Sequence, residues 1–284
     1  MFQRIYIEVG NICNLKCSFC PSTTREHKQM SAAEFEAICI KIKPHTNYIY
    51  MHVMGEPLLH PQLDELLTIA HKYDLKVCIT TNGTLLRNHE ELLLKHGDHI
   101  HRISVSLHCM EGNGAHLTMD QYLHNVIDFG KKAAQHGIFM IYRLWNLDSE
   151  EGAGANEGNA MIERTLHQAF AGEWTKRWNG FYLADHIFLE YAGIFTWPAQ
   201  SQADGEDDGY CHGLMDQVAI LVDGTVVPCC LDAEGQINLG NIFEQSMDEI
   251  LQSPRAQRMR DGFSCRKMVE ELCKTCTYAR RFKK

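Results

Sequence analysis

The chain has 284 residues, enough for one large domain or two smaller ones, and 45% of them are hydrophobic and 22% charged. Such an ordinary mixture can bury a sizeable core. The formal net charge of -9 argues against nucleic acid as the main partner, because phosphate binding requires clustered Lys and Arg. We interpret the short basic stretch at residues 280–284 as a solvated end.

The first residues carry neither the charged lead and apolar stretch of a signal peptide nor a cleavage site. No apolar run approaches the length of a membrane span. We therefore expect a cytoplasmic protein that does not associate with a membrane and whose thiols stay reduced. Its twelve cysteines then need an explanation other than disulfides, and metal or cluster ligation is the leading one.

Strand-like and helix-like segments alternate over the first two thirds of the chain. Ser31 with Glu34, and Thr118 with Gln121, have the spacing of capping boxes that open helices, and Pro61 suits the first position of another helix. This rhythm predicts a parallel sheet with outer helices, and leaves open whether the sheet is flat or curled into a partial barrel. The candidate strands span residues 5–9, 48–54, 76–80, 102–107, 139–145 and 186–191.

Two polar stretches interrupt the rhythm. Residues 148–158 indicate a loop, and the acidic, glycine-containing residues 199–209 indicate a linker. Beyond it, Asp223-Gly224 is a strong hairpin signal between two short strand patterns. We place a domain boundary near residue 205, between domains at 1–205 and 206–284.

The first cysteine group comprises Cys13, Cys17 and Cys20, on a loop directly after the first expected strand. Three thiolates on one short loop can hold a cubane cluster and leave one iron open for a further ligand. The spacing favours a metal without fixing which one. A zinc site that lacks its fourth ligand and three unrelated core cysteines remain alternatives.

The Cys-x3-Cys-x2-Cys spacing resembles the signature of the radical S-adenosylmethionine (SAM) superfamily, and Phe19 occupies the position where that family places a ring near the adenine. The resemblance covers roughly residues 5–192. It implies an α/β fold, a partial (β/α)6 barrel, with a [4Fe-4S] cluster whose open iron chelates the amino and carboxylate groups of SAM. One electron, from a reductant such as flavodoxin or ferredoxin, would then yield methionine and a 5′-deoxyadenosyl radical that abstracts hydrogen from a substrate.

Further matches to the family follow at the ends of the expected strands, where barrel-type α/β proteins gather their sites. One is a Gly-Glu-Pro turn resembling the motif that receives the SAM amino group, although such a tripeptide also suits an ordinary turn. An arginine on the fifth strand is chemically reasonable, because its fork pairs bidentately with a carboxylate. The residues that the resemblance assigns to SAM are Phe19, Gly55, Glu56, Pro57, Asn82, Ser104, Ser106 and Arg143.

A second group of four thiols is formed by Cys211, Cys229, Cys273 and Cys276. The hairpin would return Cys229 towards Cys211, and the closing Cys-x2-Cys would complete the set. By spacing alone, a structural zinc site fits as well as a cluster.

The surrounding pattern resembles the shortened SPASM extension called a twitch domain, which implies a small α+β domain with one auxiliary [4Fe-4S] cluster. The sequence ends eight residues after the last of these cysteines, so we expect no further auxiliary cluster. With four thiolate ligands the cluster would transfer electrons rather than bind substrate. Cys230 and Cys265 are spare, and either could replace a ligand.

Cys109 follows the fourth expected strand and is expected to face the cavity, together with His108 and Glu190. A thiol there could donate a hydrogen atom to a substrate radical, as in radical SAM epimerases. The alternative is a packed or merely exposed loop cysteine.

The resemblance suits several reactions. The first is the two-electron oxidation of a small molecule, with the second electron passing to the auxiliary cluster; the architecture is similar to that of the deoxy-scyllo-inosamine dehydrogenase of aminoglycoside biosynthesis. The second is epimerisation or crosslinking of a ribosomally made peptide. A third possibility, of another class, is a non-enzymatic iron–sulfur or zinc protein that binds a partner. The substrate itself is not encoded in any recognisable pattern.

Overall fold

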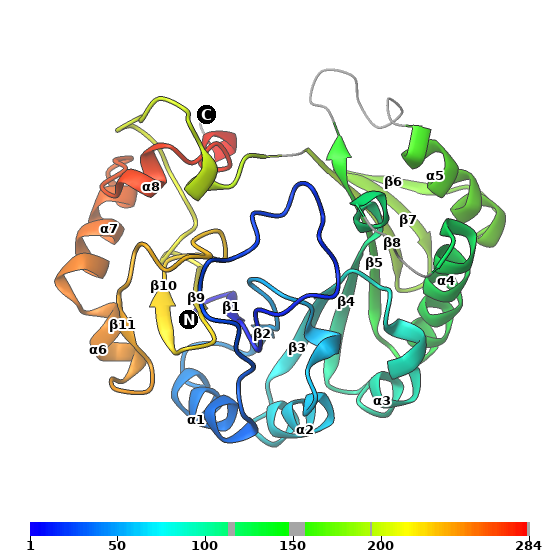
Figure 1. Ribbon diagram of the computed structural model, residues 1–284, viewed down its shortest axis with the longest axis horizontal. Helices are drawn as coiled ribbons and strands as arrows, with labels where there is room; N and C mark the ends of the chain where they lie inside the picture. The colour runs from blue at the N-terminus through cyan, green and yellow to red at the C-terminus, as the bar shows by residue number, and fades with distance from the viewer. Residues whose placement is uncertain (113–116, 148–156, 194, 283–284) are drawn as a thin grey trace.

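The computed structural model describes residues 1–112, 117–147, 157–193 and 195–282. The loop expected at 148–158 and the end of the basic stretch at 280–284 lie largely or partly outside these ranges. One curved sheet lines the inside of the molecule and helices cover its outside (Figure 1).

All six expected strands are present and pair in parallel. Hydrogen bonding orders them in the sheet as they follow in the chain. They are β1 (Arg4–Ile7), β2 (Tyr48–Tyr50), β3 (Lys76–Thr81), β4 (Ile100–Ser106), β5 (Phe139–Leu147) and β8 (Ile187–Gly193). Together with the outer helices they form the expected partial barrel.

The sheet continues past both ends of this parallel set to a total of 11 strands. On one side β8 pairs antiparallel with β7 (Gly180–Ala184), which pairs with β6 (Thr175–Arg177). Sequence analysis missed both strands: β6 is polar, and β7 (Gly-Phe-Tyr-Leu-Ala) is a short, mainly apolar run without alternation.

On the other side, β9 (Gln217–Ile220) pairs in parallel with β1, and β10 (Thr225–Val227) and β11 (Gly240–Asn241) follow antiparallel. The Asp223-Gly224 hairpin is confirmed, and Gly224 has a φ of +86° that favours glycine. Because β9 lies beside β1, strands from both sides of the expected domain boundary near residue 205 belong to one continuous sheet.

The outer helices begin largely where their capping signals predict. The capping boxes of Ser31 with Glu34 and of Thr118 with Gln121 are both formed. The expectation for Pro61 is wrong by two residues: α2 begins at Leu63, and Pro61 lies in the turn before it. The α-helices are α1 (Ala32–Ile42), α2 (Leu63–Lys72), α3 (Glu90–Lys95), α4 (Met119–Gln135), α5 (Glu157–Ala169), α6 (Met247–Leu251), α7 (Pro254–Ser264) and α8 (Glu271–Lys274).

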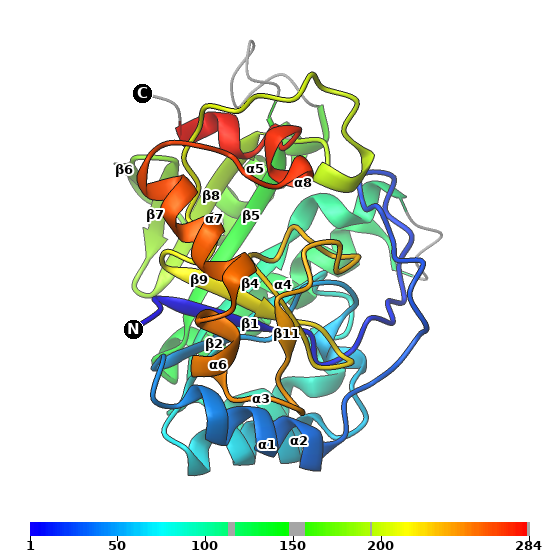
Figure 2. The same cartoon turned by 90° about the vertical axis from the view of Figure 1, so that its left-hand side faces the viewer.

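Within the described ranges, five short 3-10 helices lie between these elements or after the last of them. Figure 2 shows α6 and α7 on the outer side of the C-terminal strands. The 3-10 helices are η1 (Pro57–Leu59), η2 (Leu86–His89), η3 (Leu107–Gly112), η4 (Pro198–Gln200) and η5 (Ala279–Phe282).

The two faces of the sheet differ in chemistry, because side chains alternate along a strand. On β4, Ile103 and Val105 are fully buried in the main apolar core. Such burial stabilises the fold by about 1.5–3 kcal/mol per side chain. Arg102 and Ser106 alternate with them and line a cavity on the inner face. The inner face therefore presents polar side chains to the cavity, where a functional site can form.

In the part of the chain that the structure describes, no helix combines the length and the apolar character needed to cross a membrane.

Candidate active site

The three-cysteine loop connects β1 to α1 and crosses the centre of the molecule (dark blue in Figure 1). Cys13 and Cys20 are exposed and Cys17 is half-buried, and all three line the inner cavity. The backbone N–H of Cys20 donates to the carbonyl of Cys17 at 3.1 Å, which closes a tight turn. Partial loss of water raises the pKa of the Cys13 and Cys20 thiols, and the neighbouring thiols raise it further.

A local hydrogen-bond set returns the loop to the barrel. The Asn11 amide donates to the carbonyl of Glu26 at 2.8 Å, and its oxygen accepts from the backbone of Lys28 at 2.9 Å. Further on, the N–H of Met30 donates to the carbonyl of Val9 at 2.8 Å. The two ends of the loop are therefore held together at the mouth of the barrel.

Glu8, just beyond the end of β1, ties this loop to the C-terminal part of the chain. Its fully buried carboxylate forms a bidentate ion pair with Arg25, with distances of 2.6 and 2.8 Å. It also accepts from the backbone N–H groups of Met54 and Val222 at 3.2 and 3.0 Å. Arg25 in turn donates from Nε to the carbonyl of Ala233 at 2.8 Å. Sequence analysis missed this pair, although an acidic residue in an apolar strand was a usable signal.

The Gly-Glu-Pro turn packs directly against the three-cysteine loop. Glu56 donates its backbone N–H to the carbonyl of Ile12 at 2.9 Å. Gly55 has a φ of +80°, and a Cβ added there would lie 2.3 Å from the carbonyl oxygen of Gly10. Glycine is therefore required by both conformation and space.

The Glu56 side chain is buried at the carboxyl ends of the strands. It accepts from the backbone of Leu58 at 3.0 Å, from the Thr81 hydroxyl at 2.7 Å and from the backbone of Asn82 at 2.8 Å. Burial raises the pKa of this carboxyl, and the three donors oppose the rise. Since a carboxylate has about four acceptor positions, one remains on the oxygen that binds Asn82.

The other residues expected to contact SAM divide by position. Asn82 donates to the side-chain oxygen of Asn14 on the three-cysteine loop at 2.9 Å. Phe19, Asn82, Ser106 and Arg143 line the cavity, as do Gly55 and Glu56. Ser104 is buried in the wall and Pro57 begins η1, and neither lines the cavity. Arg143 forms an ion pair of 3.4 Å with Glu190.

Cys109 lines the same cavity, on η3. It is buried, and contact with the thiol of Cys17 and burial raise the pKa of its own thiol. The adjacent His108 is also buried, and its ring lies 4.9 Å from that of Phe19. Cys109 is therefore a neighbour of the three-cysteine loop.

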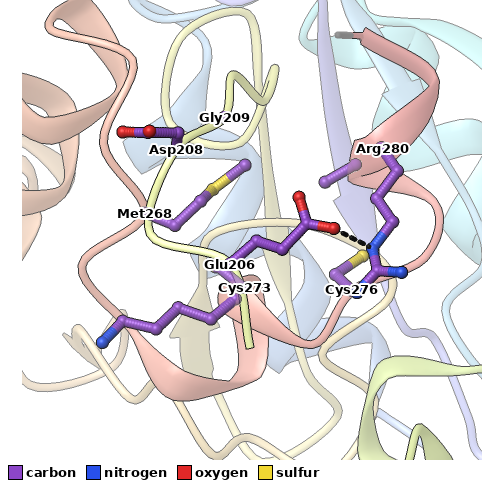
Figure 3. A pocket seen from close by; sticks show the side chains of 9 residues that line it. Glu206, Asp208, Gly209, Met268, Cys273, Cys276 and Arg280 are labelled. Carbon is purple, nitrogen blue, oxygen red and sulfur yellow. Dashed lines mark ion pairs between the residues drawn. The ribbon is translucent and has the colours of Figure 1, made fainter. Parts of the chain in front are cut away.

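The four C-terminal cysteines come from three segments, act on one another electrostatically and line the same cavity. Burial raises the pKa of the Cys273 thiol, and the nearby Cys211 and Cys276 raise it further. Burial likewise raises the pKa of Cys211 to about 11. Figure 3 shows Cys273 and Cys276 beside Glu206 and Arg280, whose ion pair measures 3.3 Å.

The two spare cysteines differ. Cys230 lines the cavity beside Tyr6, and burial raises the pKa of its thiol to about 11. Cys265 is exposed at the end of α7 and does not line the cavity.

One cavity of about 550 Å³ contains both thiol sets. None of the twelve cysteines forms a disulfide, so the thiols that line the cavity can serve as ligands. Among the described residues, no group of three or more His, Cys, Asp or Glu side chains has the arrangement to hold a single metal ion. The fit to clusters therefore depends on the donor chemistry, three and four thiols, and on the space they share.

Family models match both parts of the chain. The model of the radical SAM superfamily matches residues 7–150, and that of the iron–sulfur cluster-binding SPASM domain matches residues 211–277. The chain belongs to the radical SAM superfamily. As such it uses a [4Fe-4S] cluster and SAM, and its SPASM domain adds an auxiliary iron–sulfur cluster.

Curated relatives include proteins of different activities. A GTP 3′,8-cyclase of Nautilia profundicola is 25% identical over 89% of this chain and 90% of its own length. The S-adenosyl-L-methionine-dependent 2-deoxy-scyllo-inosamine dehydrogenase of Niallia circulans is 23% identical over 97% and 93%. The subtilosin biosynthesis protein AlbA of Bacillus subtilis is 22% identical over 89% of this chain and 60% of its own.

Solved structures share the fold. BtrN in complex with AdoMet and 2-DOIA superimposes with a TM-score of 0.61 at 18% identity, covering 98% of this chain and 93% of BtrN. AnSMEcpe with bound AdoMet gives 0.63 at 15% identity, covering 99% and 88%. The expected resemblance to a deoxy-scyllo-inosamine dehydrogenase is thus confirmed in sequence and fold.

Proposed function

We propose that this radical SAM enzyme oxidises a small molecule by removing two hydrogens from it. The observation that carries the proposal is the single cavity, which both the three N-terminal and the four C-terminal thiols line. An acceptor for the second electron would thus share a chamber with the site where the first hydrogen is removed.

In this proposal Cys13, Cys17 and Cys20 hold the SAM-binding cluster. Once bound there, the cluster supplies the electron that splits SAM into methionine and the 5′-deoxyadenosyl radical, which takes a hydrogen atom from the substrate. Glu56 offers its one remaining acceptor position to the SAM amino group, since its other contacts fix the carboxylate in place. Phe19 borders the adenine.

Ser106 and Arg143 complete the proposed SAM site from β4 and β5. The guanidinium of Arg143 pairs at 3.4 Å with Glu190, which orients its fork across the cavity. A carboxylate of SAM can share that fork, because a guanidinium has five donors. The remaining expected residues act indirectly: Asn82 holds the three-cysteine loop through Asn14, and Ser104 and Pro57 shape the wall.

Cys211, Cys229, Cys273 and Cys276 hold the auxiliary [4Fe-4S] cluster. Four thiolates occupy all four irons and leave no position for substrate, so the cluster serves as an electron acceptor. With such a cluster as acceptor, the substrate would lose one hydrogen atom to the nucleoside radical, one electron to the cluster and one proton to water. Atoms and electrons balance for a two-electron oxidation.

The proposed setting is the cytoplasm, and the proposed electron donor is a flavodoxin or ferredoxin. Twelve cysteines without a disulfide among them support a reducing compartment. The domain boundary near residue 205 stays part of the proposal, with the two domains sharing one sheet through β1 and β9.

The test uses reconstituted protein, SAM, a reductant and a defined panel of amino-cyclitols, GTP and short peptides. We expect one small molecule to stimulate 5′-deoxyadenosine formation and to lose two hydrogens, read by mass spectrometry. Cys229→Ala should abolish the oxidised product, whereas the matched control Cys265→Ala, outside the cavity, should retain it. Equal product from Cys229→Ala would refute the role of the auxiliary cluster.

A second candidate is modification of a peptide, by epimerisation or crosslinking. The observation in its favour is Cys109, a thiol on the cavity wall that could return a hydrogen atom to a substrate radical. For epimerisation it predicts a product that differs in mass from the peptide only by one deuterium taken up from deuterated solvent, and Cys109→Ala should lose this uptake. The contact of Cys109 with Cys17 favours the oxidation instead, because it points to a packing role.

A further inference from the structure

The inner end of the cavity carries two arginines that the proposed SAM site does not use. Arg4 is the first residue of β1 and Arg102 the third residue of β4, and both line the cavity. Both lie towards the amino ends of their strands, whereas the three-cysteine loop leaves the carboxyl end of β1. From Arg102 to Ser106 at the upper end of β4, four residues at about 3.3 Å each span roughly 13 Å.

Aromatic rings connect the two arginines. The guanidinium carbon of Arg102 lies 5.3 Å from the ring centre of Tyr50. Tyr50 lies 5.1 Å from Tyr6, which hydrogen-bonds Arg4. Burial raises the pKa of the Tyr6 and Tyr50 hydroxyls, so both stay neutral.

Neither arginine has a carboxylate as an ion-pair partner among the described residues. Across residues 1–112, 117–147, 157–193 and 195–282, neither Arg4 nor Arg102 forms an ion pair. The carboxylates that line the cavity have other partners. Glu190 pairs with Arg143, and Asp232 accepts two backbone N–H groups at 2.8 and 2.9 Å. Glu56 accepts from Leu58, Thr81 and Asn82. Asp216, the acidic group that acts on Arg4 electrostatically, is bonded to His212 at 2.8 Å.

Two buried polar atoms beside these aromatic rings lack a hydrogen-bond partner within the described part of the chain. They are Nε of Arg102 and Nδ1 of His52. The His52 ring lies 5.2 Å from Tyr6, and burial together with the nearby arginines lowers its pKa to about 3, so it is a neutral group. Buried polar atoms without partners are rare in folded proteins, and a bound ligand or water beside these two would satisfy them.

We propose that Arg4 and Arg102 bind an oxyanion of the substrate, a carboxylate or a phosphate, at the end of the cavity away from the three-cysteine loop. The proposal rests on the proposed function and narrows its substrate class. An arginine fork matches both oxyanions in geometry, and two half-buried guanidinium groups without an ion pair favour binding one. The substrate is then a small molecule with an anionic group at one end and the reacting C–H bond near the other, roughly 13 Å away or less.

The experiment measures binding of two probes, inorganic phosphate and acetate, to reconstituted protein that already holds SAM. Saturating SAM occupies the proposed SAM site near the three-cysteine loop, so the probes report on the site at Arg4 and Arg102. Isothermal titration gives the affinity of each probe, and phosphorus NMR line widths give a second measure for phosphate. A preference for one probe identifies the substrate group as phosphate or carboxylate.

We expect at least one probe to bind, and Arg102→Gln and Arg4→Gln each to weaken it about tenfold or more, as the loss of a charge-assisted hydrogen bond requires. Arg102→Lys should recover part of the affinity. The control is Arg260→Gln, which removes the same charge from an exposed position on α7 and should leave the affinity unchanged. Circular dichroism checks that each variant is folded.

Binding that is equal in wild type, Arg102→Gln and Arg4→Gln would overturn the proposal, as would binding of neither probe to a wild-type protein that cleaves SAM. That second result leaves the proposed function intact. Probe binding by a protein that forms no 5′-deoxyadenosine would refute the proposed function, and with it the assignment of the anion to a substrate.

Discussion

Replacing Glu8 by glutamine tests how strongly the three-cysteine loop is tied to the C-terminal part of the protein. The carboxylate is fully buried and accepts four hydrogen bonds, two of them from Arg25. The variant leaves the guanidinium of Arg25 half-buried without its counter-charge. It also places an amide N–H group where the carboxylate accepted a donor.

Breaking a buried ion pair by changing one partner costs about 3–5 kcal/mol. Unfolding entropy amounts to about 2.1 cal/mol/K per residue, or about 0.6 kcal/mol/K for 284 residues. The Tm of Glu8→Gln should therefore lie about 5–8 °C below that of the wild type. Because Arg25 also holds Ala233, cluster content after reconstitution should fall as well.

The assay is thermal unfolding of reconstituted protein under anaerobic conditions, followed by circular dichroism. Glu36→Gln is the matched control, since Glu36 forms an exposed ion pair of 2.6 Å with Lys72, and such pairs contribute little. The Arg25→Gln variant and the double variant complete a mutant cycle, in which the two changes should be far from additive. A Tm of Glu8→Gln equal to that of Glu36→Gln would refute the reasoning.

Three further predictions concern single positions. Gly55→Ala should lower Tm by several degrees more than Gly137→Ala, because both have φ near +80° but only the former would place a Cβ against backbone, 2.3 Å from Gly10; equal shifts would show that the clash is relieved. Cys229→Ala should lose about four irons per chain on reconstitution, measured by iron analysis, and a full iron content would remove it from the ligand set. Burial lowers the pKa of His108 to about 4, so stability is fully present above the unfolded value of 6.5 and is lost as pH falls towards 4, by about 2 kcal/mol at pH 5. Urea unfolding of His108→Gln should lack this part of the pH dependence, and identical slopes in variant and wild type would contradict the assignment.

Local signals predicted much of the fold. Apolar alternation located the six parallel strands, and capping boxes located the starts of α1 and α4, because these features depend on neighbours in the sequence. The pairing of β9 with β1 was not predictable, since it joins segments more than 200 residues apart whose register depends on the whole sheet. Strand β7 pairs with β8 and β6 pairs with β7, so the polar β6 depends on its neighbour in the sheet rather than on an apolar pattern of its own.

The candidate site was predictable where a motif is short and continuous. Spacing found both thiol sets, and the cavity that they share came only from the folded chain. Glu8 and Arg25 were missed because an ion pair across a loop leaves no spacing rule. Arg102 was missed for a similar reason: its significance is the absence of a carboxylate nearby, which depends on every other residue of the cavity.

The central claim is that Cys13, Cys17 and Cys20 hold a cluster that cleaves SAM. The most direct measurement is the formation of 5′-deoxyadenosine and methionine when anaerobically reconstituted protein, with about eight irons per chain, is incubated with SAM and a reductant. We predict equal amounts of both products from the wild type and none from Cys17→Ala, which should retain about four irons. A wild-type protein with its full iron content that forms no 5′-deoxyadenosine would contradict the account.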